Sequence, residues 1–351
     1  MDADINSNND NNDNDDDNND NVDLSMSLIH EVFDYIHPDY KLLIHREGST
    51  DVERAKLLSI DLIMKSGMEN EFENVLLCHR FKVKLCTIAA GRGYISTLRW
   101  AHEHECGWNQ DTCKAAAEGG HLDCLVWARE HGCRWKKKDM CNSAALGGSV
   151  PCLKWIRGQG CSWDTTTCAY AAFTGHLNCL IWAQEHGCPW DASTSVLAAM
   201  GGQLNCLIWA QEHGCDLIMD TCSEAAKSGH LDCLIWAREH GCDWDKDTCT
   251  NAAQRGHLNC LIWAREHGCD WNEDTCHRAA SLGHLDCLIW AREHECPWDA
   301  ATCRFAAMGG QLNCLIWARE HGCEWDPVHC KKVGLSGDHT HIVEWIESQG
   351  F

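Results

Sequence analysis

Residues 247–273 read DTCTNAAQRGHLNCLIWAREHGCDWNE, and residues 274–300 read DTCHRAASLGHLDCLIWAREHECPWDA. Nine units keep this layout from Lys84 to Pro327, and a shortened tenth unit runs from Val328 to Phe351. One Trp of each unit marks the period at intervals of 27 or 28 residues: Trp100, Trp127, Trp155, Trp182, Trp209, Trp236, Trp263, Trp290, Trp317 and Trp345. A fixed period in this range predicts a solenoid of stacked units, which offers a long surface in place of a single cleft.

Each unit has the pattern of two short helices. Asp247 is a suitable N-cap for a first helix, and Gly256 is suited to end it. Apolar residues at helical spacing predict a second helix from Leu258 to about His267, which Gly268 ends. Because one hairpin cannot bury its own apolar faces, the units are expected to stack into an all-α array over residues 84–351.

The repeat resembles the ankyrin repeat. The Ala-Ala-x-x-Gly-His signature stands at Ala252, Ala253, Gly256 and His257, and the Gly-Ala-Asp ending stands as Gly268, Cys269 and Asp270. Two departures are the reduction of Thr-Pro-Leu-His to Asp-Thr-Cys and a period shorter than the usual length of about 33 residues. This Trp- and Cys-rich variant is similar to arrays of large DNA viruses and some protists. The resemblance implies a non-enzymatic array that binds protein near its first helices.

The chain has 351 residues and a formal net charge of −23, and its first 22 residues hold eight Asp and no basic residue. Residues 1–22 are expected to be disordered, because they contain almost nothing apolar to bury. The acidic array argues against nucleic acid, whose phosphates need a basic track, and against an anionic membrane surface. The one cationic run, Lys136 to Lys138, is interpreted as a solvated loop.

Location follows from two further observations. The N-terminus is acidic where a secretory signal needs basic residues. The longest apolar runs fall far short of the ~18–20 residues of a membrane helix. We therefore expect a soluble, cytoplasmic protein, in the host cytoplasm if its origin is viral.

The 27 Cys residues follow the register of the repeat. Nine are equivalent to Cys249, eight to Cys260 and nine to Cys269, and only Cys78 lies outside. These positions suit Cys as a small hydrophobe. Equivalent Cys of successive units are expected at about the helix-packing distance of ~8–10 Å, too far for disulfides, which need Cα atoms within ~7 Å. No metal or other cofactor is expected.

The His residues are also candidates for metal ligands. His257 and Cys260 could supply two zinc ligands, but Gln203 and Gln311 replace His257 in other units. We therefore interpret His257 as a hydrogen-bonding turn residue. A Cys/His metal-binding protein remains a distant alternative. No catalytic arrangement of residues rises above the repeat background, so an enzyme is not expected.

The first helices vary where the second helices do not. Four apolar residues on two adjacent units predict a partner-binding patch: Tyr170, Phe173, Leu197 and Met200. The following loop adds Leu217, Ile218 and Met219, with Leu217 in place of a Trp. The alternative is that these side chains fill gaps between first helices.

Residues 23–83 are expected to form a small helical head. Residues 24–44 resemble the start of an F-box, and the matching or helically spaced apolar residues are Leu24, Leu28, Ile29, Val32, Phe33, Ile36 and Pro38. That resemblance implies docking on a Skp-type adaptor of a cullin ubiquitin ligase, with the array as substrate receptor. The alternative is a head that caps the first repeat and leaves a plain interaction scaffold.

Overall fold

The structure is a computed structural model that describes the backbone of residues 79–351 and the side chains of residues 85–351. The predicted tail at residues 1–22 lies outside the described residues. So do the F-box-like residues from Leu24 to Pro38. These interpretations therefore stay predictions.

Residues 79–351 contain twenty α-helices and no strand, arranged as ten hairpins. The first helices of the hairpins are α5 (His79–Arg92), α7 (Gln110–Glu118), α9 (Met140–Leu146), α11 (Thr165–Phe173), α13 (Ser193–Met200), α15 (Met219–Ser228), α17 (Lys246–Arg255), α19 (Glu273–Leu282), α21 (Ala300–Met308) and α23 (Pro327–Ser336). The second helices are α6 (Ile95–Glu103), α8 (Leu122–Glu130), α10 (Val150–Gly158), α12 (Leu177–Glu185), α14 (Leu204–Glu212), α16 (Leu231–Glu239), α18 (Leu258–Glu266), α20 (Leu285–Glu293), α22 (Leu312–Glu320) and α24 (Thr340–Ser348). The predicted all-α array of about ten hairpins is confirmed. Helix α5 crosses the expected boundary between head and array at residue 84.

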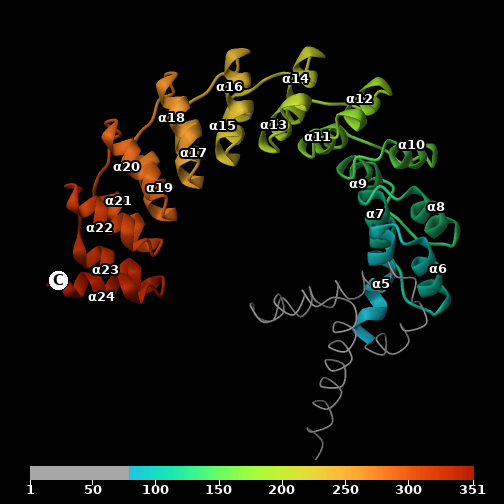
Figure 1. The fold of residues 1–351 in the computed structure, drawn as a ribbon, viewed down its shortest axis with the longest axis horizontal. Helices are drawn as coiled ribbons and strands as arrows, with labels where there is room; N and C mark the ends of the chain where they lie inside the picture. Colours follow the sequence, from blue (N-terminus) through green and yellow to red (C-terminus); the bar gives the residue numbers. More distant parts are fainter. Residues whose placement is uncertain (1–78) are drawn as a thin grey trace, which may run out of the picture. The chain divides into compact units, whose positions relative to one another are not determined.

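The chain divides into two compact units, and each is described by itself. The first includes Tyr94–Trp108 with α6, and the second includes Asn109–Phe351 with α7 to α24. Within the second unit the first helices form one row and the second helices another, with the first helices on the inner side (Figure 1). Neighbouring first helices pack closely, whereas neighbouring second helices touch only lightly.

Several first helices begin with a side-chain cap, and here one prediction is wrong. Asp247 is not the N-cap of α17, because it already lies in the first turn. The cap is Asp245, which has extended backbone and accepts a hydrogen bond from the backbone N–H of Asp247 over 3.0 Å. Asp164 and Asp299 cap α11 and α21 in the same way. At the other end, Gly256 adopts φ 75° and ends α17 as predicted.

Small residues explain why the first helices stack so closely. Nine of the ten units have an Ala-Ala pair, such as Ala252 and Ala253, and each pair is fully buried. In most units the second helix contributes one large buried side chain, such as Leu261, beside the smaller Cys260 and Ala264. The stack is therefore held by Ala, Cys and Leu, and the side chains that flank the Ala pair can differ between units.

Trp residues join the units along their second helices. The loop Trp of one unit lies against the second-helix Trp of the next, with ring centroids 5.5 to 5.9 Å apart, in these pairs: Trp135–Trp155, Trp163–Trp182, Trp190–Trp209, Trp244–Trp263, Trp271–Trp290, Trp298–Trp317 and Trp325–Trp345. In several units an Arg covers the loop Trp, as Arg238 does over Trp244 at 4.5 Å. The matching loop position before Trp236 holds Leu217, which interrupts the series.

Candidate partner-binding site

The four apolar residues singled out on the first helices flank the buried Ala pairs. Tyr170 and Phe173 stand on either side of the Ala pair of α11, and Leu197 and Met200 do so in α13. Tyr170, Phe173 and Leu197 are half-buried, and Met200 is 37% exposed. The Ala pairs hold the two helices together, so the flanking side chains reach the surface of the inner row. We call these four residues the inner patch.

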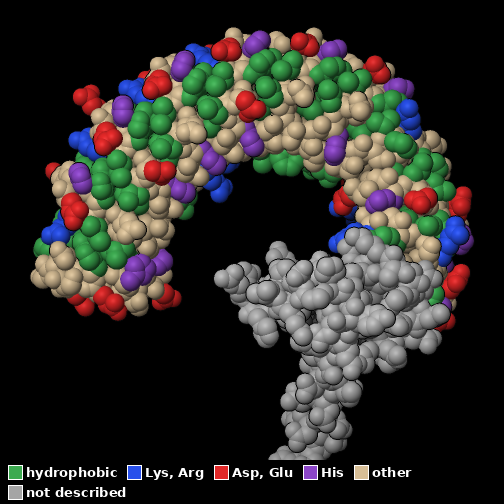
Figure 2. Space-filling model, in the orientation of Figure 1, with side chains coloured by type: hydrophobic (Ala, Val, Ile, Leu, Met, Phe, Trp, Pro, Cys, Tyr) green, Lys and Arg blue, Asp and Glu red, His purple; other side chains and the backbone are tan. Residues whose placement is uncertain are grey.

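The inner patch lies on neighbouring helices, because α11 and α13 pack along their length. Hydrophobic side chains reach the inner rim of the array at these two helices (Figure 2). Three of the four side chains are half-buried, so each fills space between helices and also presents apolar surface. Packing and contact with a partner are therefore compatible at these positions.

The three loop residues occupy a different place. Leu217 is half-buried in the loop, Ile218 is 40% exposed, and Met219 is 49% exposed as the first residue of α15. Successive units repeat one hairpin, so α13 and α15 run in the same direction. Met200 ends α13 and Met219 begins α15, which separates them by about a helix length, ~12 Å for eight residues. The structure does not bring the loop residues into the inner patch, and we call Leu217, Ile218 and Met219 the edge residues.

Ile218 also changes how its helix begins. It occupies the N-cap position of α15, where the equivalent residues of α11 and α17 are the capping carboxylates Asp164 and Asp245. The hydroxyl of Thr221 accepts a hydrogen bond from the backbone N–H of Ile218 over 3.4 Å, but Ile218 has no side-chain oxygen to cap the helix. The unit therefore has a weaker helix start together with exposed apolar surface. That combination indicates that Ile218 does not serve to stabilise the fold.

A second apolar group was missed by the sequence argument. Phe305 and Met308 flank the Ala pair of α21 as Tyr170 and Phe173 flank that of α11. Met308 is 47% exposed, and Leu282 and Leu335 on the adjoining first helices are 46% and 57% exposed. The signal was present, because RFAAM in α21 matches AYAAF in α11 position by position.

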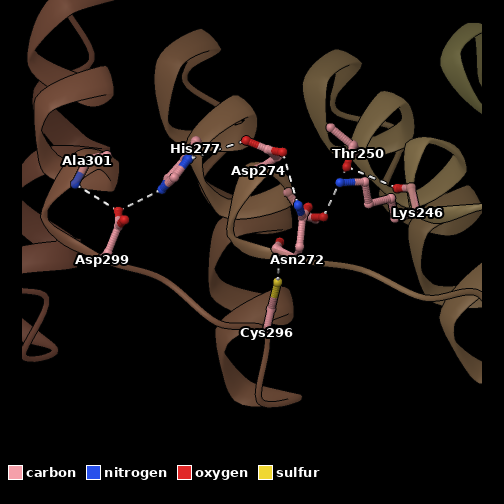
Figure 3. Close-up of polar contacts among 9 residues, drawn as sticks. Lys246, Thr250, Asn272, Asp274, His277, Cys296, Asp299 and Ala301 are labelled. Carbon is pink, nitrogen blue, oxygen red and sulfur yellow. Dashed lines mark hydrogen bonds and ion pairs between the residues drawn. The ribbon is translucent and has the colours of Figure 1, made fainter.

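His277 makes a polar connection between two first helices that the repeat pattern did not reveal. Its Nε2 lies 2.8 Å from Oδ1 of Asp299, and its Nδ1 lies 3.7 Å from Oδ1 of Asp274 (Figure 3). Asp299 also accepts a hydrogen bond from the backbone N–H of Ala301 at the start of α21. Partial burial raises the pKa of Asp299, but the hydrogen bonds from His277 and Ala301 outweigh it and hold the pKa below its usual value. His277 is buried, and its ring lies 5.4 Å from that of Phe305. This is the environment of a structural link between α19 and α21.

All 26 Cys residues in the described part of the chain are buried and in no disulfide, as expected for small hydrophobes. The third class does more than fill space. Cys269 donates from Sγ to the carbonyl oxygen of Asp245 over 3.1 Å, and Cys296 does so to Asn272 over 3.4 Å (Figure 3). The acceptor is each time the N-cap residue of the same unit. The thiol thus ties the loop after the second helix to the start of the first.

His257 behaves as the predicted turn residue. Its side chain makes a hydrogen bond with the backbone of Lys227 in the preceding unit. Its ring covers Gly229, where an added Cβ would lie only 2.5 Å from Nδ1 of His257. Gln203 and Gln311 instead donate to backbone carbonyls of their own units, at 2.9 and 2.8 Å. Within residues 79–351 no group of three or more His, Cys, Asp or Glu is arranged to hold a metal ion.

Comparison with known proteins adds little to this description. No family model and no curated protein matches the sequence. Among solved structures, the human ASB11 ankyrin repeat domain is similar at 17% identity, over 45% of this chain and 84% of that chain, with a TM-score of 0.39. No helix in the described part of the chain is long and apolar enough to cross a membrane.

Proposed function

We propose that this chain is an ankyrin-type, non-enzymatic array that binds another protein on the surface of its first helices, with the inner patch as the anchor. One observation carries the proposal. The positions that flank the Ala pair are apolar on α11 and α13, whereas the same positions hold Glu224 and Lys227 on α15 and Asn251 and Gln254 on α17. Units that share one packing scheme do not require that difference.

The physical argument is that the stack is already complete without the flanking side chains. The Ala pairs, the buried Leu of the second helices and the Cys residues are the same in nearly all units. Aromatic and Met side chains are enriched in the cores of protein interfaces. A patch with Tyr170, Phe173 and Met200 on a half-exposed surface has the composition of such a core. The edge residues add a second contact region at the other end of the first helices.

The test is quantitative capture of partners by the full chain and by matched variants. Phe173→Ala should weaken capture by more than about tenfold, which corresponds to ~1.4 kcal/mol, because aromatic anchors commonly contribute ≥2 kcal/mol. Gln254→Ala is the matched control, because Gln254 occupies on α17 the position of Phe173 on α11. Equal capture by wild type and Phe173→Ala would remove the inner patch from the binding surface.

The head gives this proposal a finer form. Residues 24–38 resemble the start of an F-box, so we include in the proposal that the head docks on a Skp-type adaptor and that the array delivers its captured protein to a cullin ubiquitin ligase in the cytoplasm. Ile29→Ala with Phe33→Ala should abolish adaptor capture and leave target capture unchanged. If wild type captures the target but no Skp-type adaptor, the protein is a plain scaffold with a capping head.

A further inference from the structure

The first helices α19, α21 and α23 carry a second exposed surface, which differs in composition from the inner patch. Each of these consecutive helices pairs one cationic side chain with one exposed apolar side chain. The two members of a pair are three or four residues apart, so they are neighbours on one face of their helix. We call these residues the mixed surface: Arg278 and Leu282 on α19, Arg304 and Met308 on α21, and Lys332 and Leu335 on α23.

The cations of the mixed surface are not neutralised by the fold. Within residues 85–351, none of the three forms an ion pair. Arg278 and Lys332 are exposed, and Arg304 is half-buried. The adjacent Lys331, in contrast, lies 2.7 Å from a carboxylate oxygen of Glu347. In a chain with a net charge of −23, three such cations on helices that pack against one another form a local exception.

The helix dipole does not account for these cations. A positive side chain is stabilised at the C-terminus of a helix, but the effect falls off within the last turn. Arg278 is the sixth of ten residues of α19, Arg304 is the fifth of nine in α21, and Lys332 is the sixth of ten in α23. All three therefore lie in the middle of their helices, where their charge gives the helix little.

Carboxylates at the starts of these helices do not supply the missing partners either. Asp299 lies 2.8 Å from Nε2 of His277, and Asp274 lies 3.7 Å from its Nδ1 (Figure 3). Both acidic side chains are thus engaged by one imidazole between α19 and α21. The cations of the mixed surface remain available to negative charge from outside these helices.

The apolar half of the mixed surface is equally unnecessary for packing. Leu282, Met308 and Leu335 are all exposed. On α17 the position of Leu282 holds Arg255, and the position of Met308 and Leu335 holds Gln254. The same stack therefore tolerates polar residues at these places. Exposed apolar side chains that the fold does not require commonly mark a contact with a partner.

The spacing of the helices limits the shape of the ligand. Neighbouring first helices are expected to pack at ~8–10 Å, a distance that about three residues of an extended chain cover at ~3.3 Å each. We propose that the mixed surface binds an extended acidic segment of a partner protein in which an apolar residue recurs about every third position. The carboxylates of the segment face the three cations, which sets its specificity, and its apolar side chains cover the three apolar residues. This surface has its own ligand and does not depend on the inner patch, so the inference goes beyond the proposed function.

The test is fluorescence anisotropy of labelled synthetic peptides titrated with the full chain at low salt. The probe peptide repeats Glu-Glu-Leu, and two control peptides repeat Lys-Lys-Leu and Glu-Glu-Ser. A third control peptide has the sequence of residues 1–22, which is acidic and contains almost nothing apolar. We expect the Glu-Glu-Leu peptide to bind most tightly. Its affinity should fall as salt is added, because salt screens pairs of exposed charges.

Matched variants locate the binding on the array. Arg278→Ser with Lys332→Ser should weaken binding of the Glu-Glu-Leu peptide by about fivefold or more, given the usual strength of exposed ion pairs, and Leu335→Ser should weaken it as well. Lys246→Ser, which removes an exposed cation at the start of α17, and Phe173→Ala in the inner patch should both bind as wild type does.

Several results would overturn the proposal. Equally tight binding of any control peptide would show that acidic and apolar residues are not both required. Unchanged affinity after the double substitution would remove the cations from the site. A loss of peptide binding in Phe173→Ala that matches the loss in the double variant would show that the two surfaces are not independent. A failure of the inner patch to capture a partner would leave these peptide results unaffected, so the two proposals are tested separately.

Discussion

The thiol of Cys269 donates a hydrogen bond to the carbonyl oxygen of Asp245 over 3.1 Å, and the side chain of Asp245 caps helix α17. Asp245 thus makes two contacts: its backbone carbonyl accepts the hydrogen bond from the loop after α18, and its carboxylate caps the start of α17. The same relation joins Cys323 to Asp299 over 3.1 Å. The array is therefore fastened within each unit by the cap residue as well as between units by Ala, Leu and Trp.

The first prediction separates the cap from the residue that the sequence favoured. Asp245→Ala should lower the free energy of unfolding by about 1 kcal/mol, the usual contribution of an N-cap. Asp247→Ala should cost less, because Asp247 offers only a favourable charge near the helix start, at 0.3–1 kcal/mol as a rough range. Urea unfolding followed by circular dichroism measures both. A larger loss for Asp247→Ala would contradict the assignment of the cap.

The second prediction concerns the two kinds of buried Cys. Cys269→Ser should be well tolerated, because the new hydroxyl inherits the carbonyl of Asp245 as acceptor. Cys260 is fully packed among apolar side chains, and Cys260→Ser should cost more, roughly 1–3 kcal/mol, for a buried hydroxyl that lacks a good partner. Thermal unfolding of the two variants side by side provides the comparison. If both lose the same stability, the thiol of Cys269 is only filling space.

The third prediction is a dependence of stability on pH. Burial lowers the pKa of His257 below 6.5, with neighbouring positive groups adding to the effect and the hydrogen bond to Lys227 opposing it. The folded state thus prefers neutral His257. Its contribution to stability is complete above about pH 6.5, the unfolded value, and is lost as the pH falls through the folded value.

A matched variant tests this assignment. His257→Gln places at this position the residue that Gln203 and Gln311 already provide elsewhere in the array. The difference in unfolding free energy between wild type and His257→Gln should shrink or reverse between pH 7 and pH 5. A difference that stays constant over that interval would show that protonation of His257 does not affect the fold.

The fourth prediction concerns the Trp series. Leu217→Trp restores the loop Trp opposite Trp236 and should stabilise the array by about 0.5–1.5 kcal/mol, the value of an aromatic pair beyond its buried area. Trp244→Leu copies the natural interruption in the next unit and should destabilise it by a similar amount. For both variants, the change in stability is measured as a shift of the midpoint of urea unfolding, with the slope of the transition unchanged. Opposite signs for the two variants support the series, and equal signs contradict it.

The hairpins were predictable because the repeat shows each constraint many times. Gly256 and the apolar spacing of residues 258–267 fixed the two helices, and the 27-residue period fixed their stacking. Asp245 was missed because its neighbour Asp247 is also a good capping residue, and only backbone geometry distinguishes them. The residue at which the first helix starts could be identified only from the structure.

The candidate binding site was harder to predict from the sequence, because the burial of a side chain in the stack depends on residues of the neighbouring units. The apolar nature of Tyr170 and Phe173 was visible, but their half-buried state was not. The sequence grouped Met219 with Met200, which lie at opposite ends of adjacent helices.

The central claim is that a partner protein lies on the first helices at α11 and α13, and site-specific photocrosslinking tests it most directly. A benzophenone amino acid would be placed in the full chain at position 173, and in separate variants at position 254 on α17 and position 212 on the opposite row of helices. We predict one crosslinked partner from position 173, with a weaker or absent product from 254 and none from 212. Crosslinking of the same partner from position 212, with none from 173, would contradict the account.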